Sequence, residues 1–215
     1  MNWRDLLFWR RPPVADAKAL ADFIDEQAAF LVQKGMYEYS RARAGHYSKV
    51  LFSEQEFQDA LERSRWSAYP LGLAMVGEVV EGVLRPHAAA GEARQLESLS
   101  ALVLSVLDRY PRPAQLDHQT WSEARADLAR RLQAIGLHPP KRAKDIPEPY
   151  AKAYWDLMPI KKEVRSADFP TTRGYLMVVL CNIHDELSGR IDAPAVARQL
   201  VEGAPSSPPR DHAVQ

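Results

Sequence analysis

The chain has 215 residues, and its 28 Lys and Arg residues are balanced by 28 Asp and Glu residues, so its formal net charge is zero. This balance argues against a protein that binds DNA, RNA or anionic lipid through its overall charge, although it leaves local basic patches open. Cys181 is the single cysteine, which excludes an intramolecular disulfide and a zinc site built on cysteines.

The N-terminus does not have the pattern of a secretory signal, because its short apolar run is followed by Arg10 and Arg11 and then by prolines. No stretch of the chain approaches eighteen uncharged apolar residues, so we predict no membrane-spanning helix. We therefore expect a cytoplasmic protein, which would be peripheral on the inner face of the membrane if its N-terminal segment binds lipid.

Helix signals begin shortly after the first prolines. Asp16 is a typical N-capping residue for a helix that extends to about Ala42, and Gly45 is a typical residue to end it. Ser53 and Glu56 have the spacing of a capping box, which predicts the start of a second helix.

Prolines and capping residues divide the next part of the chain. Pro70 fits the first turn of a separate helix over residues 71–84. Leucine and valine residues at helical spacing then predict a helix that ends near Leu107. Asp117 or Thr120 is the expected start of the helix that follows.

A proline-rich, basic connector over residues 138–149 is the clearest internal boundary of the sequence. Helices are predicted after it over residues 150–157, 170–187 and 192–201. The tail over residues 203–215 is small, polar and rich in proline, a composition that predicts disorder.

These patterns predict an all-α protein, an irregular helical bundle of about eight helices with a short N-terminal amphipathic segment and a disordered C-terminal tail. The expected organisation is an aromatic and basic segment over residues 1–13, a single helical domain over 14–202 and the tail over 203–215. Alternation of apolar and polar residues is absent, so no sheet is expected. A buried strand is the alternative to a helix over residues 175–181.

The first thirteen residues, MNWRDLLFWRRPP, combine aromatic and leucine side chains with three arginines ahead of a proline pair. Such a segment is typical of a boundary between water and an apolar surface, either a membrane or the groove of a partner. The predicted contact residues are Trp3, Arg4, Leu7, Phe8, Trp9, Arg10 and Arg11. In the alternative, Trp3 and Phe8 pack onto the core of the protein itself.

Glu78 and Glu81 lie three residues apart, on one face of a predicted helix, where two carboxylates could bind a metal ion. Together with His184 they define an alternative function, a metal-binding or enzymatic helical bundle. We favour a helix at the edge of the bundle, with Glu81 and Arg85 as a surface ion pair and His184 hydrogen-bonded at the edge of the core. No metal or cofactor is therefore expected.

Tyrosines and arginines also alternate over residues 37–49. The candidate anion-binding residues are Tyr37, Tyr39, Arg41 and Arg43, extended by Lys141, Arg142 and Lys144 of the connector. Such residues can hold phosphates and stack on bases, so a nucleic-acid-linked regulator is a second alternative. Glu38 interrupts the cluster, and the zero net charge argues against nucleic acid, so we favour a solvated rim of the bundle.

The sequence has no nucleophile elbow, no phosphate-binding glycine loop and no dinucleotide fingerprint. Nothing in it argues for an enzyme, although the sequence does not decide the question. We expect a non-enzymatic helical interaction protein, an adaptor or assembly factor, whose N-terminal segment docks on a protein partner or a membrane surface. The sequence leaves the oligomeric state open.

Overall fold

The structure is a computed structural model that describes residues 12–88 and 91–202. Its helices are α1 (Ala17–Ala44), α2 (Ser48–Leu51), α3 (Gln55–Leu84), α4 (Glu92–Leu107), α5 (His118–Ile135), α6 (Ala151–Asp156), α7 (Phe169–Ser188) and α8 (Ala193–Glu202). Short 3-10 turns η2 (Gly45–Tyr47), η3 (Arg85–His87) and η4 (Ala143–Asp145) join some of them. The all-α prediction is confirmed. The predicted N-terminal segment, up to residue 11, and the predicted tail lie outside the described residues.

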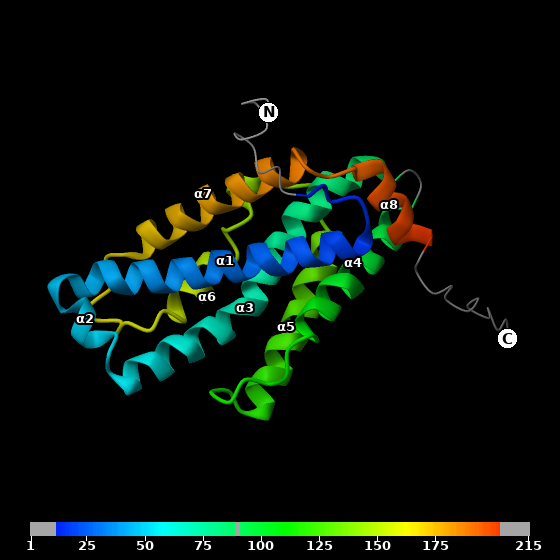
Figure 1. The fold of residues 1–215 in the computed structure, drawn as a ribbon. Coiled ribbons are helices and arrows are strands. Elements are labelled where there is room, and N and C mark those ends of the chain that lie inside the picture. The colour runs from blue at the N-terminus through cyan, green and yellow to red at the C-terminus, as the bar shows by residue number, and fades with distance from the viewer. Residues whose placement is uncertain (1–11, 89–90, 203–215) are drawn as a thin grey trace, which may run out of the picture.

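The helices form an irregular bundle around α3. Helix α3 packs against α1, α4, α5, α7 and α8, and α1 runs along the molecule from the end that carries α8 to the end that carries α2 (Figure 1). Helix α7 lies beside α1. Within the described part of the chain, β pairing is limited to an isolated parallel bridge between Val14 and Ile191. The run 175–181, where a strand was the alternative, is part of α7.

Helix α3 is the centre of the core. Its residues 68–81 are all buried, so this half of the helix is covered on every side. This corrects the prediction that residues 71–84 form a helix at the edge of the bundle. Among the described residues, the stretch Gln55–His87 is long and apolar enough to cross a membrane. However, 83% of its most apolar 18-residue segment is buried inside the protein itself. Packing against the other helices accounts for its apolar character.

Pro70 lies inside α3, and the prediction that it starts a separate helix is wrong. A proline in a helix interior removes one backbone hydrogen bond and normally breaks or kinks the helix. Here the residues on both sides of Pro70 are buried against neighbouring helices. We attribute the continuity of α3 to this burial, which outweighs the local preference to stop.

Local rules account for several helix ends and fail at one predicted cap. Asp16 and Asp117 accept hydrogen bonds at 2.7 Å from the backbone N–H groups of the third residue after them, and Gly45 ends α1 with a φ of +52°. The predicted capping box is wrong, because Glu54 precedes the first residue of α3 and makes no side-chain cap. Ser53 donates its hydroxyl hydrogen back to the carbonyl oxygen of Val50 at 2.7 Å instead.

Candidate functional site

The predicted docking segment joins the helical body at residues 12–14, which we call the N-terminal junction. The Nε and Nη2 atoms of Arg190 donate hydrogen bonds to the carbonyl oxygen of Pro12 at 3.1 and 3.0 Å. The backbone N–H of Val14 donates to the carbonyl oxygen of Arg190 at 2.9 Å, and that of Asp192 donates to the carbonyl oxygen of Val14 at 3.0 Å. The junction is therefore fixed to the turn between α7 and α8.

Side-chain packing reinforces this junction. Val14 is buried, with 1% of its surface exposed. The guanidinium of Arg190 also pairs with Glu186 and lies over the ring of Phe23, 5.5 Å from its centroid. Residues 12–14 are thus tied through these contacts to α1, α7 and α8. The predicted contact residues Trp3 to Arg11 themselves lie outside the described residues.

Glu78 is a buried carboxylate that holds the connector against α3. Lys141 donates from Nζ to Glu78 Oε1 at 2.7 Å, and the hydroxyl of Tyr150 donates to Glu78 Oε2 at 3.0 Å. The ring nitrogen Nε2 of His138 lies 3.8 Å from the same carboxylate. Burial, and then the charge of Glu78, raise the pKa of Tyr150 well above its ordinary value. The hydroxyl therefore stays protonated and serves as a donor.

Glu81 and Arg85 form an ion pair inside the protein, which corrects the prediction of a surface pair. Their atoms Oε1 and Nε are 2.5 Å apart, and the two side chains are 7% and 15% exposed. Arg85 also donates to the carbonyl oxygens of His138 at 2.8 Å and of Ile135, the last residue of α5, at 3.2 Å. A cation at this position satisfies carbonyl groups that a helix end leaves free. Arg85 thus anchors the end of α5 and the start of the connector.

His184 stands apart from these buried acids. Its Nδ1 lies 3.2 Å from the carboxylate of the adjacent Asp185, and the side chain is half-exposed on α7. No group of three His, Cys, Asp or Glu residues in the described ranges has an arrangement that could hold a metal ion. Glu78, Glu81 and His184 are therefore not brought together into a shared site.

Two members of the Tyr/Arg cluster fasten α7 to the end of α1. The hydroxyl of Tyr39 donates to Asp168 Oδ2 at 2.7 Å, and Arg43 Nε lies 3.0 Å from the same oxygen. Arg43 also donates to the carbonyl oxygen of Val164. Burial, and then the hydrogen bond to Asp168, raise the pKa of Tyr39. This contact is internal to the fold.

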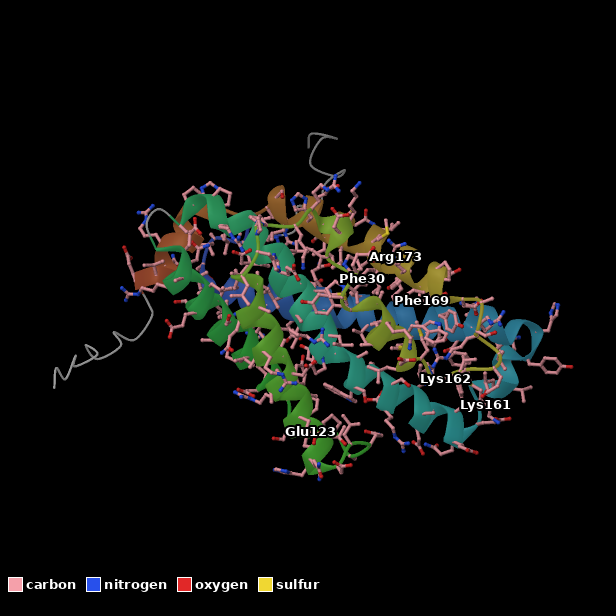
Figure 2. The ribbon with its side chains drawn as sticks, turned by 180° about the vertical axis from the view of Figure 1, so that it is seen from behind. Phe30, Glu123, Lys161, Lys162, Phe169 and Arg173 are labelled. Atoms are coloured by element: carbon pink, nitrogen blue, oxygen red, sulfur yellow. The ribbon has the colours of Figure 1, made fainter. Side chains whose placement is uncertain are left out.

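The other candidate anion-binding residues do not join Tyr39 and Arg43 in one patch. Tyr37 packs its ring against Phe52 at 4.9 Å, and Arg41 and Lys144 are exposed. Arg142 forms a surface ion pair at 2.7 Å with Asp145, which also belongs to the connector, while Lys141 pairs with Glu78. The connector is also held by α7, because Arg173, which is labelled in Figure 2, donates from Nε to Glu148 at 2.8 Å. The connector's cations are thus used mainly to fix the connector itself.

A polar and aromatic cluster around Asp25 on α1 was not predicted from the sequence. Tyr69 and Tyr110 donate their hydroxyl hydrogens to Asp25 Oδ1 at 2.6 and 2.9 Å, and Arg109 lies 3.3 Å from Oδ2. Burial, and then the hydrogen bond to Asp25, raise the pKa of both tyrosines. One sequence signal could have indicated a partly buried carboxylate, since Asp25 directly follows the apolar Phe23 and Ile24. Its partners come from distant parts of the chain and have no common motif.

Comparison of the chain with protein-family models, with curated proteins and with solved structures gives no match.

Proposed function

We propose that the protein is a helical interaction protein, an adaptor or assembly factor, that docks through its N-terminal segment on an anionic membrane surface. In this proposal Trp3, Phe8 and Trp9 insert into the interface, and the arginines supply attraction to phosphate groups. Each basic residue near such a surface contributes about 1 kcal/mol, so the arginines and the aromatic anchors must act together. Binding would be reversible.

The observation that carries the proposal is the N-terminal junction. Arg190 and the backbone of Val14 fix the chain at the turn between α7 and α8. Trp9 is only three residues before Pro12, and three extended residues span about 10 Å. A surface that binds Trp9 would therefore keep the α7–α8 turn within about 10 Å of it.

A larger protein complex is the other surface on which the same segment fits. Tryptophan and arginine are enriched among the residues that dominate binding at protein interfaces, so the composition is compatible with a groove on a partner. Docking on a membrane requires lipid, whereas docking on a partner protein does not, so vesicle binding distinguishes the two.

The test is flotation of the full-length protein with vesicles of phosphatidylcholine, with and without phosphatidylserine. We expect flotation only with the anionic vesicles, and its loss in the variants Trp3→Ala/Trp9→Ala and Arg10→Ala/Arg11→Ala. Tyr47→Ala is the matched control, because Tyr47 is 77% exposed and lies at the far end of α1 from the junction. It should float like the natural protein.

Equal flotation of the natural protein and the Trp3→Ala/Trp9→Ala variant would overturn the membrane proposal. Capture of interacting proteins from native lysate, with and without detergent, then tests the protein-partner version. That version requires a partner that persists in detergent and is lost in the same variant.

A further inference from the structure

A cavity of about 170 Å³ lies between the middle of α1 and the middle of α3. Its walls are the side chains of Ala29 and Val32 from α1, of Trp66 and Tyr69 from α3, and of Tyr110 beyond the end of α4. Gln33 and Arg65 complete the lining. Val32 and Tyr69 are buried and Gln33 is exposed, so the cavity has an apolar floor and a polar mouth.

The aromatic walls are held in place by contacts outside the cavity. Trp66, Tyr69 and Tyr110 pack edge to face, with ring centroids 5.3 to 5.8 Å apart. Both tyrosine hydroxyls donate to Asp25, which does not line the cavity, and Trp66 Nε1 donates to Glu62 at 2.8 Å. The hydrogen-bonding atoms of the three rings are thus already satisfied, and the rings offer carbon surface to an occupant.

This surface and volume fit one aromatic ring. An apolar cavity of about 150 Å³ in another protein accommodates benzene. Edge-to-face and stacked contacts with fixed aromatic walls favour a planar ring over an aliphatic chain of the same size. Because the walls are fixed in advance, an occupant would not have to order them, which favours binding.

The positive charge of Arg65 at the cavity favours an acidic substituent on that ring. Among the described residues that line the cavity, Arg65 alone carries a formal charge, and no carboxylate is present. The guanidinium lies over the Trp66 ring, 5.2 Å from the centroid, and its Nη2 pairs with Glu62 at 2.5 Å. Guanidinium has five N–H donors, so this pairing leaves donors for a second carboxylate.

We infer that this cavity binds a small, single-ring aromatic carboxylate. The ring packs between Val32, Trp66, Tyr69 and Tyr110, and the carboxylate pairs with Arg65 at the mouth, where Gln33 provides a further polar contact. This inference is independent of the N-terminal segment, because all the residues that form the cavity belong to the helical body.

The test uses three probes of nearly equal size: benzoate, its neutral isostere benzamide and the cation benzylammonium. Binding to the full-length protein is followed by amide chemical-shift changes in NMR titrations. We expect saturable binding of benzoate, about tenfold weaker binding of benzamide because the charge-assisted pair is lost, and the weakest binding for benzylammonium.

Two pairs of variants locate the site. Ala29→Leu fills the cavity from α1, and Ala19→Leu is its control, since Ala19 is another half-buried alanine of α1 that does not line the cavity. Arg65→Gln removes the charge at the mouth, and Arg63→Gln removes a charge from an exposed position on the same helix. Circular dichroism checks that each variant is folded.

We expect Ala29→Leu to abolish benzoate binding and Ala19→Leu to preserve it. Arg65→Gln should bind benzoate and benzamide equally, whereas Arg63→Gln should retain the preference for benzoate. The inference is overturned if benzoate shows no saturable shift, if benzamide binds the natural protein as tightly as benzoate, or if Ala29→Leu binds benzoate like its control.

Discussion

Gly35 of α1 lies directly against Tyr175 of α7. A Cβ atom placed on Gly35 would come within 2.7 Å of Tyr175 Cε1 and would also meet the hydroxyl of Tyr154. This close approach brings the hydroxyl of Tyr175 to the carbonyl oxygen of Leu31, to which it donates at 2.9 Å. The missing side chain at Gly35 is therefore a condition for the packing of α1 against α7.

Replacement of Gly35 by alanine should destabilise the protein by about 1–3 kcal/mol, because the methyl group overpacks a tight interface. Gly174→Ala on α7 is the matched control, since a Cβ there meets no atom within 4 Å. It should stabilise the protein by up to about 1 kcal/mol through its higher helix propensity. Urea unfolding followed by circular dichroism measures both changes, and equal effects of the two substitutions would contradict the packing described.

Lys141→Met should destabilise the protein by about 3 kcal/mol, because it leaves the charge of Glu78 buried with only part of its partners. Glu78→Gln in the Lys141→Met background should recover much of this loss, since the neutral amide needs no counter-charge. Arg142→Met is the control, because Arg142 pairs with Asp145 on the surface. A double variant as unstable as Lys141→Met alone would argue against an uncompensated charge as the cause.

Arg190→Gln should loosen the N-terminal junction without unfolding the bundle. The substitution removes the hydrogen bonds from the guanidinium to Pro12, each worth about 1 kcal/mol. We expect about tenfold faster hydrogen exchange at the backbone N–H groups of Val14 and Asp192. Arg125→Gln, which removes a half-exposed ion pair with Asp108, should leave exchange at these two sites unchanged. Unchanged exchange in Arg190→Gln as well would mean that the backbone bridge alone holds the junction.

The protein should lose stability at alkaline pH. The pKa values of Tyr39, Tyr69, Tyr110, Tyr150, Tyr154 and Tyr175 are all raised, with burial as the largest cause. Folding therefore favours the neutral hydroxyls, and this contribution is fully present below about pH 10, the ordinary tyrosine pKa, and is lost as the pH rises above it.

In a pH titration, the phenolate absorbance of these tyrosines should rise together with the loss of the helical circular dichroism signal. Denaturant should shift the absorbance change down to the ordinary tyrosine range. Ionisation of all the tyrosines near pH 10 with the helical signal intact would contradict the burial on which the prediction depends.

Much of the secondary structure was predictable because its signals are local. Asp16, Asp117 and Gly45 act within one turn of their own helix, so their neighbours in sequence suffice to identify them. Apolar residues at helical spacing indicated most of the other helices, and the absence of alternating patterns indicated the all-α class. Local signals failed at Pro70 and at Ser53, where burial and a competing hydrogen bond decided the outcome.

The candidate sites depended on contacts between residues far apart in the chain. Glu78 was predicted on a helix at the edge of the bundle, and only the fold places Lys141 and Tyr150 against it. The same holds for Asp25, whose partners Tyr69 and Tyr110 follow it by 44 and 85 positions. The composition of the first thirteen residues, by contrast, is a property of the sequence itself, and it motivates the docking proposal without any contact.

The sequence by itself thus determined the helical class, most helix ends and the unusual N-terminal segment, since each depends on residues within a few positions of one another. The tertiary structure alone decided that Glu78 and Glu81 are buried, that Tyr39 and Arg43 fasten α7, and that aromatic rings of α3 and of the segment after α4 line a cavity. The physical reason is that the energy of a charge or a ring depends on which partners surround it, and those partners are brought together only when the helices pack.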